Sequence, residues 1–584
     1  MKQTLIQSIF AAHTKEPVTV DAIVDLAIDL RAARDFGGAN VVKHLQDHGL
    51  PIADPRKTLF TFDCNPGGCD QKYAINQHLC RQYARAHNIP IYDINAGIGT
   101  HLVVDNGLVN PGDTFVSTDS HANILGAIGA FGQGMGDIDI AYAFAHGTTW
   151  FKVPPTTLIT LTGTPSPHAT AKDIVLHITK ETGANGLLGS AAELTGPYTT
   201  RCTQDERLTI ASMGTEMGAI SLLFPPAKTT KQTPPAYDHT LTIDIDGLPP
   251  QLSRPGHPED VTAVKDCEGT LVDSGFIGSC TNGRLEDLRK AAAILKGKQI
   301  APGRILKIVP ATDAIWNACL REGLLKIFKD AGALIGSAGC AGCAAGQIGQ
   351  TGTGEVTIST GNRNFTGKQG KGDIYLASPE TVAASLIAGY ITTIDAIPTH
   401  PMTVTQPPQR QAQTKPEPMT QKPSMHVQGK AWVVPQDNID TDAIYHNRYL
   451  TVTNLAEMGQ YTFTSFKGYE TLAKQIHPGD IIVTGQNFGC GSSRQQAVDC
   501  FKSLGVSLII AESFGAIYER NAINSAFPIL TAPDAAQQIS TGDVLTADLN
   551  TGVITNTKTK KKLQAKPFSS VQRSIYERGG LLER

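Results

Sequence analysis

Residues 401–425 divide the chain into two parts that must fold separately. This segment contains 6 Pro, 5 Gln and 4 Thr, so it has few apolar groups to bury and cannot offset the entropy cost of becoming ordered. Its prolines favour extended backbone, which predicts a semi-rigid tether. The chain therefore consists of a large part, residues 1–400, and a small part, residues 426–584.

Both parts alternate short strand-like runs with helical patterns. Runs of β-branched and other apolar residues predict strands at 157–161, 305–309, 480–484 and 507–510. Apolar residues at helical spacing predict helices over 21–34 and 381–388. Strands separated by helices indicate an α/β fold with parallel or mixed sheets.

Composition excludes several classes of protein. Apolar residues make up 41% and charged residues 18% of the chain, and the net charge is −3, which gives no electrostatic basis for binding nucleic acid or an anionic membrane. No run of 18 or more apolar residues occurs, and the N-terminus reads neither as a secretory signal nor as a transit peptide. We therefore expect a cytoplasmic protein, in which 11 cysteines indicate thiols or metal ligands before disulfides.

Three cysteines lie in glycine-rich surroundings. Cys340 and Cys343 form a C-x-x-C, and Cys280 lies about 60 residues earlier; a C-x-x-C can place two thiolates on one metal centre. With a third thiolate, one iron of a four-iron cluster stays open for Lewis-acid chemistry. Spacing alone also fits a redox dithiol, a zinc corner or two packed thiols.

The wider context of these cysteines matches a known family. Phe-Ile-Gly-Ser-Cys-Thr-Asn at 276–282 and Gly-Cys-Ala-Gly-Cys at 339–343 closely resemble the cluster-ligand segments of the aconitase superfamily, nearest to its isopropylmalate isomerase and homoaconitase branch. The resemblance implies one 4Fe–4S cluster with an open iron site that binds the substrate hydroxyl, held by Cys280, Cys340 and Cys343. It also implies a three-domain α/β body that carries the cluster and a swivelling α/β domain at 426–584.

A second segment resembles a carboxylate-binding site of that family. Asn-Arg-Asn-Phe-Thr-Gly-Lys at 362–368 is similar to the family's Asn-Arg-Asn-Phe-x-Gly-Arg. By resemblance, Asn362 and Arg363 bind a substrate carboxylate, which a guanidinium can do with two hydrogen bonds. Lys368 stands where the family has arginine, and it replaces a planar fork by a point charge. This departure leaves the identity of the substrate open.

The small part contributes further predicted site residues. Asn-Phe-Gly-Cys-Gly-Ser-Ser-Arg at 487–494 reads as a glycine-rich strand-to-helix turn, which favours anion binding. By resemblance, Ser492 removes the substrate proton as an alkoxide, and Ser493, Arg494 and Arg448 bind substrate. The alternative for Ser492 is an ordinary helix N-cap. The apolar Val452 fits an alkyl substituent slightly better than a third carboxylate.

The acid–base residues are also assigned by resemblance. Ser-Thr-Asp-Ser-His at 117–121 is similar to the family's Thr-Asp-Ser-His, which implies catalytic roles for Asp119 and His121. His101 matches the histidine of the family's Gly-Ile-x-His with one residue more in the spacing, and Glu193 resembles the glutamate that pairs with these histidines. An imidazole paired with a carboxylate can relay protons near neutral pH.

Asp63 and Cys64 mark the largest departure from the family, which has Asp-His at this place. Three interpretations of Cys64 remain open. In the first, protons reach the site through water, His101 or His121, and Cys64 is a tolerated change. In the second, Cys64 itself donates the proton, since neighbours tune a thiol pKa. As a fourth cluster ligand, it would close the iron site.

These residues predict an iron–sulfur hydro-lyase. It would interconvert a 2-hydroxy and a 3-hydroxy polycarboxylate by dehydration and rehydration, with 2-isopropylmalate of leucine biosynthesis as the leading substrate and citrate or homocitrate as the alternative. We expect no nucleic acid, membrane or separate small subunit as partner, and a monomer or homodimer. Hypotheses from other classes are an RNA-binding regulator that acts when the cluster is lost and a zinc-stabilised binding module.

Overall fold

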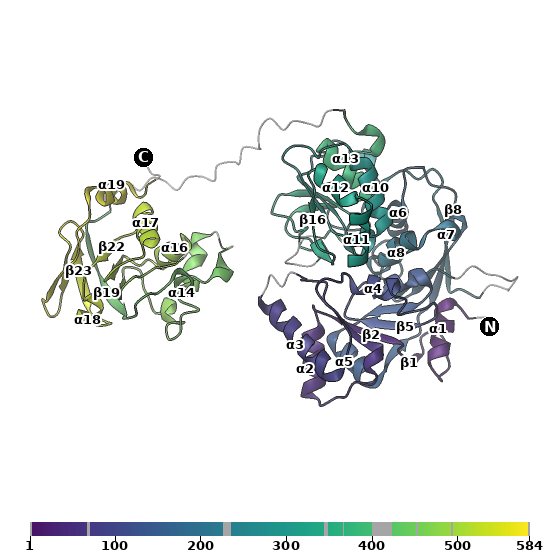
Figure 1. Ribbon diagram of the computed structural model, residues 1–584, viewed down its shortest axis with the longest axis horizontal. Coiled ribbons are helices and arrows are strands. Elements are labelled where there is room, and N and C mark those ends of the chain that lie inside the picture. Colours follow the sequence, from purple (N-terminus) through teal and green to yellow (C-terminus); the bar gives the residue numbers. More distant parts are fainter. Residues whose placement is uncertain are drawn as a thin grey trace. The chain divides into compact units, whose positions relative to one another are not determined.

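The computed structural model describes residues 3–66, 71–225, 235–343, 348–365, 367–399, 423–450, 452, 454–491 and 494–581. The chain forms two compact units, Met1–Pro407 and Pro408–Arg584, which Figure 1 shows with their elements labelled. Residues 401–422 of the predicted tether lie outside the described part of the chain.

A five-stranded parallel sheet carries the first part of the candidate site. Its order is β4-β3-β2-β5-β6, with the bounds β2 Leu30–Arg34, β3 Thr58–Thr61, β4 Ile91–Tyr92, β5 Thr114–Ser117 and β6 Phe131–Gly134. Every residue of β2 is buried, as expected of a central strand in a covered parallel sheet. Helices α2 (Gly38–Asp47), α3 (Gln71–His87) and α5 (Asp137–His146) lie beside this sheet (Figure 1).

Residues 21–34 form two strands, so the predicted helix over this range is wrong. Strand β1 (Ile23–Ala27) pairs with β7 (Thr148–Lys152) and alternates exposed and buried residues, and β2 follows after a short bend. A two-residue period in β1 followed by a fully buried strand places apolar residues three and four positions apart. This spacing imitates the apolar face of a helix.

Two further sheets complete the first unit. The four-stranded parallel sheet has the order β10-β9-β8-β11, and the seven-stranded mixed sheet has the order β13-β12-β18-β17-β14-β15-β16. Their strands are β8 Thr156–Thr162, β9 Ala191–Thr195, β10 Ser221–Leu223, β11 His239–Asp244, β12 Gln251–Ser253, β13 Val261–Ala263, β14 Ser274–Ile277, β15 Ile305–Ile308, β16 Leu334–Ile335, β17 Val356–Ser359 and β18 Asp373–Leu376.

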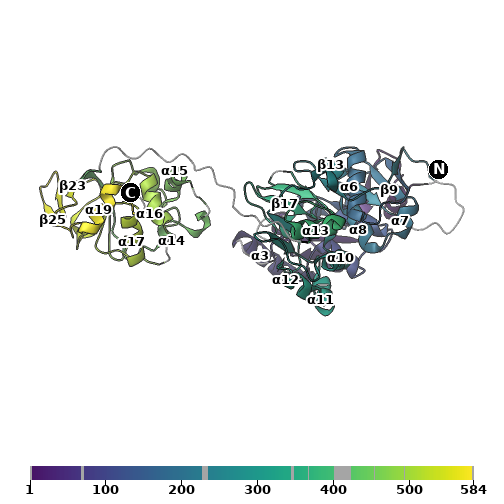
Figure 2. The same cartoon turned by 90° about the horizontal axis from the view of Figure 1, so that it is seen from above.

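Helices α10 (Leu285–Leu295) and α13 (Pro379–Ala388) pack against each other, and α13 also lies on β14 (Figure 2). Helix α13 contains the predicted helix 381–388, and β8 and β15 cover the predicted strands 157–161 and 305–309. The predicted α/β class with parallel sheets is therefore confirmed.

The second unit is built on one seven-stranded sheet. Its order is β22-β21-β20-β19-β23-β24-β25, parallel from β22 to β19 and antiparallel from β19 onward. The bounds are β19 His426–Val434, β20 Ile481–Thr484, β21 Leu508–Ala511, β22 Ile529–Thr531, β23 Val544–Asp548, β24 Val553–Asn556 and β25 Lys562–Gln564. Strands β20 and β21 confirm the two strands predicted at 480–484 and 507–510. Helices α16 (Gln496–Ser503) and α17 (Ala516–Asn524) accompany the parallel half.

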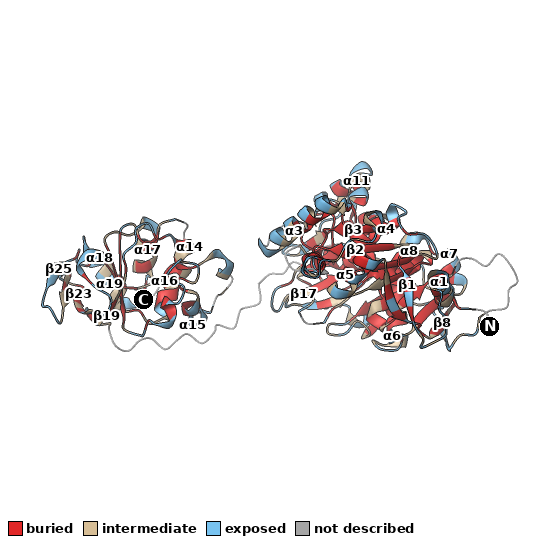
Figure 3. Cartoon of the chain, turned by 90° about the horizontal axis from the view of Figure 1, so that it is seen from below, coloured by how far each residue is buried: buried red, intermediate tan, exposed pale blue. Residues whose placement is uncertain are grey.

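Each unit has its own apolar cores. Figure 3 shows the strands of both units as mostly buried, with exposed residues on the outer helices. None of the helices in the described part of the chain combines the length and the apolar character needed to span a membrane.

Candidate active site

Three charged side chains meet at the carboxyl edge of the five-stranded sheet. Arg34 ends β2, while Asp63 and Asp119 follow the ends of β3 and β5, the two strands that flank β2. The Arg34 Nε donates to Asp63 Oδ1 (2.7 Å), and its Nη1 lies 2.9 Å from Asp119 Oδ1. Because the carboxyl ends of parallel strands lie at one edge, the sheet order itself places this guanidinium between the two carboxylates.

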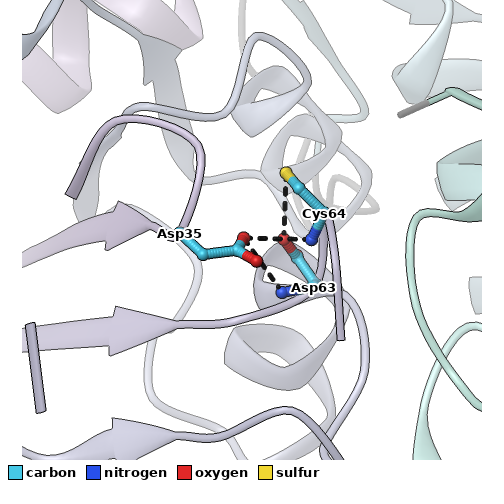
Figure 4. A group of neighbouring side chains, drawn as sticks. All are labelled: Asp35, Asp63 and Cys64. Atoms are coloured by element: carbon cyan, nitrogen blue, oxygen red, sulfur yellow. Dashed lines mark hydrogen bonds between the residues drawn. The ribbon is translucent and has the colours of Figure 1, made fainter. Parts of the chain in front are cut away.

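Asp35, Asp63 and Cys64 form a buried group beside the clamp that the Arg34 guanidinium makes with the Asp63 and Asp119 carboxylates. Figure 4 shows this group in close-up. Asp35 accepts hydrogen bonds from the backbone N–H groups of residues 63, 64 and 65 and from the Gln77 amide. These donors occupy both of its carboxylate oxygens, so Asp35 organises the loop after β3. The proximity of the three side chains therefore reflects loop folding and not an ion-binding site.

Cys64 contacts the clamp directly, because its Sγ donates to Asp63 Oδ1 at 3.6 Å. Burial raises the pKa of Asp63 to about 7, against the opposing charge of Arg34. Burial also raises the pKa of the Cys64 thiol well above its usual value. Asp63 and Cys64 thus form a pair that can hold a proton near neutral pH.

The predicted ligands Cys280 and Cys340 come together from two different loops. Cys280 lies in α9 (Ser279–Asn282) directly after β14, and Cys340 precedes the 3-10 turn η5 (Ala341–Cys343). Their side chains hydrogen-bond to each other, and this bond and burial raise the pKa of the Cys280 thiol. Both thiols are buried. The side chain of Cys343 lies outside the described residues.

The backbone around these cysteines is unusual. Ser279 and Ala341 have φ values of 75° and 51°, a left-handed conformation that ordinary residues rarely adopt. At Gly342 a Cβ would lie 2.6 Å from the Gln369 Nε2, so only glycine fits between Cys340 and Cys343 without displacing that side chain. Such outliers cluster at functional loops.

The cysteine loops contact the carboxylate loops directly. The Cys340 backbone N–H donates to the Asp63 carbonyl at 2.9 Å, and the His101 Nε2 lies 3.0 Å from the Cys280 carbonyl. The thiol pair and the acid–base residues therefore belong to one site.

His101 has a different environment from the one predicted. Arg284 Nη1 lies 3.5 Å from its Nδ1, and Nε2 contacts the Cys280 carbonyl; these partners assign the ring proton to Nε2. Burial and the charge of Arg284 lower the pKa of His101 to about 4. His101 is thus a neutral ring that positions Cys280. The neighbouring Thr100 contacts Asp119, because its hydroxyl donates to Oδ2 over a long 3.5 Å.

The predicted histidine–glutamate pair exists with a different glutamate. His121 Nε2 lies 3.2 Å from Glu216 Oε1, and Arg363 Nε donates to the same oxygen at 2.7 Å. His121 and Arg363 lower the pKa of Glu216 although burial opposes this shift. Glu193, the residue predicted for this role, accepts from the Leu5 N–H and the Tyr237 hydroxyl, and Glu216 is the glutamate that contacts His121.

A buried lysine holds the segment that carries Arg363 in place. Lys172 is fully buried, and its Nζ donates to the Gly361 carbonyl at 2.7 Å. The neighbouring Asn362 is buried, whereas Lys368 is only partly buried. Within the described residues, no ion pair is found for the Lys368 ammonium.

In the second unit, the predicted anion site lies at the turn between β20 and α16. Arg494 forms a fork with the Asp442 carboxylate, in which its Nη2 donates to Oδ2 at 2.7 Å. Arg448 donates to the Ser465 hydroxyl and lies over the Tyr449 ring. Ser492 and Ser493 lie outside the described residues.

Comparison with known proteins decides the family. The family described as "Aconitase family (aconitate hydratase)" matches residues 7–233 and 227–389, and the "Aconitase C-terminal domain" matches residues 422–534. The chain belongs to the aconitase family. The predicted membership and the prediction of an iron–sulfur hydro-lyase are therefore confirmed.

Individual relatives agree with this assignment. The chain is 37% identical over 412 residues to the 3-isopropylmalate dehydratase large subunit of Nitratidesulfovibrio vulgaris, an alignment that covers 67% of this chain and 99% of the relative. It is 35% identical over 409 residues to the homoaconitase large subunit of Thermus thermophilus, covering 67% of this chain and 97% of that one.

The chain also matches a solved structure, that of 3-isopropylmalate dehydratase (leuD) from Methanocaldococcus jannaschii. It is 35% identical and aligns with 27% of this chain and 92% of its own length, with a TM-score of 0.26.

Members of the aconitase family carry a 4Fe–4S cluster, and the residues of this site fit one. Thiol sulfur is the ligand that iron–sulfur clusters use, and two of the three predicted thiols touch each other in a buried loop pair. The buried Arg34 Nη2 has no hydrogen-bond partner in the described structure, so a donor is available beside these loops.

Sequence reasoning missed three residues of this aconitase-family site, namely Arg34, Thr100 and Glu216. A signal existed for each of them. Arg34 stands directly after two alanines and before Asp35 at the end of a strand, Thr100 stands at the unshifted spacing of Gly-Ile-x-His, and Glu216 is bracketed by Gly214 and Gly218. None of these signals identifies a partner, because each partner lies on a distant segment.

Proposed function

We propose that the chain interconverts 2-isopropylmalate and 3-isopropylmalate by dehydration and rehydration. The observation that carries the proposal is the direct contact of the two cysteine loops with the acid–base loops, through Cys340 to Asp63 and through His101 to Cys280. A site of this kind combines thiolate ligands for a metal cluster with groups that hold and move protons.

Cys280, Cys340 and Cys343 would hold one 4Fe–4S cluster with an open iron site. When bound, the cluster supplies Lewis-acid polarisation of a substrate hydroxyl. The protein residues supply the remaining functions. Arg363 would bind a carboxylate, and the Glu216 carboxylate fixes both this guanidinium and the His121 ring.

The proposed reaction needs two proton steps. Ser492 would remove the proton from the carbon next to the hydroxyl, with Arg494 and Ser493 binding the substrate. The Asp63–Cys64 pair would hold the proton that the leaving hydroxyl needs. The contact of Cys64 Sγ with Asp63 Oδ1 supports this role for Cys64 over that of a fourth cluster ligand.

The choice of isopropylmalate rests on the relatives and on one contact. Several relatives of about the same identity are named 3-isopropylmalate dehydratase large subunits, and Val452 packs against the apolar and aromatic core that contains Tyr445. Homoaconitate or aconitate hydration is the alternative, because the homoaconitase large subunit is equally similar. The match of residues 422–534 to the C-terminal domain suggests that no separate small subunit is needed.

Anaerobic purification followed by iron and sulfide determination tests the cluster. Absorbance of the enoate intermediate is then followed with 2-isopropylmalate, citrate and homocitrate. We expect iron and sulfide together with turnover of 2-isopropylmalate. Turnover of the tricarboxylates alone would transfer the assignment to aconitate or homoaconitate, and zinc without sulfide would refute the hydro-lyase site.

Cys64→Ser separates the remaining interpretations of this residue. Loss of turnover with iron content and cluster spectrum unchanged is expected if Sγ supplies the proton. Full activity of the variant would show that Cys64 is a tolerated replacement. A gain of activity would show that its thiol closes the iron site.

A further inference from the structure

Arg34 has one guanidinium nitrogen for which the fold provides no partner. Nε and Nη1 bind Asp63 and Asp119, whereas Nη2 is buried and has no acceptor among the described residues. A buried charged donor left without an acceptor costs about 1–3 kcal/mol or more. Nearly all such groups in native proteins have a partner, so this nitrogen indicates an acceptor other than the residues that the structure describes.

The surroundings of Arg34 specify where that acceptor lies. The guanidinium charge acts on the Cys64, Cys340 and Cys280 side chains, which places Arg34 beside the thiol pair. The two carboxylates bind Nε and Nη1, so two ion pairs fix the direction of Nη2. A fixed plane of this kind is suited to hydrogen-bonding one oxygen of a carboxylate or another anion.

Arg34 is also one end of a row of polar contacts. Asp119 Oδ1 pairs with Arg34 and accepts from the backbone N–H of His121 at 3.0 Å. His121 then contacts Glu216, which pairs with Arg363. These contacts therefore form one row of polar groups with a guanidinium at each end.

We propose that Arg34 is a second anion-binding residue of this site, whose Nη2 hydrogen-bonds a negatively charged group at the thiol pair. Two sources could supply that anion. One is a second carboxylate of the substrate, an assignment that rests on the proposed function. The other is a sulfur of the family cofactor held by Cys280 and Cys340. Both anions would accept a hydrogen bond from Nη2. They differ in which measured property changes when Nη2 is lost.

Arg34→Lys tests the proposal, because lysine keeps the positive charge but cannot bind Asp63, Asp119 and an anion with a planar fork. Arg31→Lys is the matched control. Arg31 is a buried arginine on the same strand whose nitrogens donate to the backbone carbonyls of Asp54, Lys57 and Ile28. It therefore reports the effect of losing a buried guanidinium from β2 away from the site.

Both variants are prepared anaerobically as holoenzyme, and three quantities are measured. These are the dissociation constant of L-malate, a small hydroxy-dicarboxylate probe, by calorimetry; the midpoint potential of the cluster by EPR; and thermal unfolding. If the substrate carboxylate is the acceptor, Arg34→Lys weakens malate binding by about tenfold or more at an unchanged potential. If the acceptor is a cluster sulfur, the potential shifts and malate binding is retained.

The proposal is overturned if Arg34→Lys, folded as well as the control, changes neither quantity. If the variant does not fold, a crystal structure of the wild-type holoenzyme with malate decides the matter. An acceptor about 3 Å from Nη2 supports the proposal, and a guanidinium bound only to Asp63 and Asp119 refutes it. Absence of turnover with every polycarboxylate would refute the proposed function alone, since malate binding and the potential still report on Arg34.

Discussion

Replacing Glu216 by glutamine tests which glutamate serves as the partner of His121. The structure places Glu216 beside this histidine, whereas the sequence analysis predicts Glu193. The carboxylate is buried and accepts from Arg363 Nε at 2.7 Å, with His121 Nε2 at 3.2 Å. Each charge-assisted bond contributes about 1.5–3 kcal/mol, and a glutamine oxygen restores one neutral bond of about 1 kcal/mol. The expected net loss of stability is therefore about 2–5 kcal/mol.

The same change should lower activity. Without the carboxylate, the His121 ring and the Arg363 guanidinium lose the group that orients both, and we expect kcat to fall by about 100-fold. Initial rates with the substrate used by the wild type measure this loss. Urea unfolding measures the stability of the first unit.

Glu193→Gln is the matched control, because Glu193 is an equally buried carboxylate that binds the Leu5 N–H and the Tyr237 hydroxyl. It should lose stability and keep kcat within about threefold, since its two known contacts lie at the start of α1 (Leu5–His13) and at Tyr237. The reasoning is refuted if Glu193→Gln abolishes turnover while Glu216→Gln retains it.

Three further predictions concern other parts of the chain. Cys340→Ser should lose at least one iron per chain and most of the activity, as measured by iron and sulfide analysis, and a fully loaded active variant would contradict the ligand assignment. Burial raises the pKa of Asp287 and of Glu380 to about 7, so the folded chain keeps protons that the unfolded chain releases. The free energy of unfolding should therefore fall between about pH 5 and pH 7, by up to about 1.4 kcal/mol per pH unit for each carboxyl. A double variant, Asp287→Asn with Glu380→Gln, should show a smaller dependence on pH in urea titrations. Gly489 has φ 75° and a Cβ there would lie 2.2 Å from the Tyr518 ring, so Gly489→Ala should destabilise the second unit by about 2–4 kcal/mol, and an unchanged unfolding midpoint would contradict this packing.

Local patterns predicted those parts of the fold that depend on neighbouring residues. The strand at 157–161 and the helix at 381–388 were predictable because their apolar residues repeat with one clear period. The range 21–34 was not, since β1 and β2 together produce helix-like spacing. Periodicity alone cannot detect the bend that separates two short strands.

The cysteine and carboxylate-binding segments were predicted because their chemistry depends on residues that are close together in the sequence. Cys340 and Cys343 need only a short glycine-rich loop to approach one centre. The same is true of the glycine-rich turn at 487–494, although its two serines lie outside the described residues. Residue identity and short spacing limit each segment to a few kinds of site, and the resemblance to the aconitase family selects one of them.

The pairing of the acid–base residues was decided only by the tertiary structure. The sheet order β3-β2-β5 places Arg34 between Asp63 and Asp119, and no local pattern encodes which strands become neighbours. Likewise, Thr100 and His101 are adjacent on α4 (Gly99–Asp105), and only the tertiary structure shows that the Thr100 side chain is the one that contacts Asp119. Sequence therefore determined which chemical groups are present, and the long-range packing of strands and loops decided which of them touch.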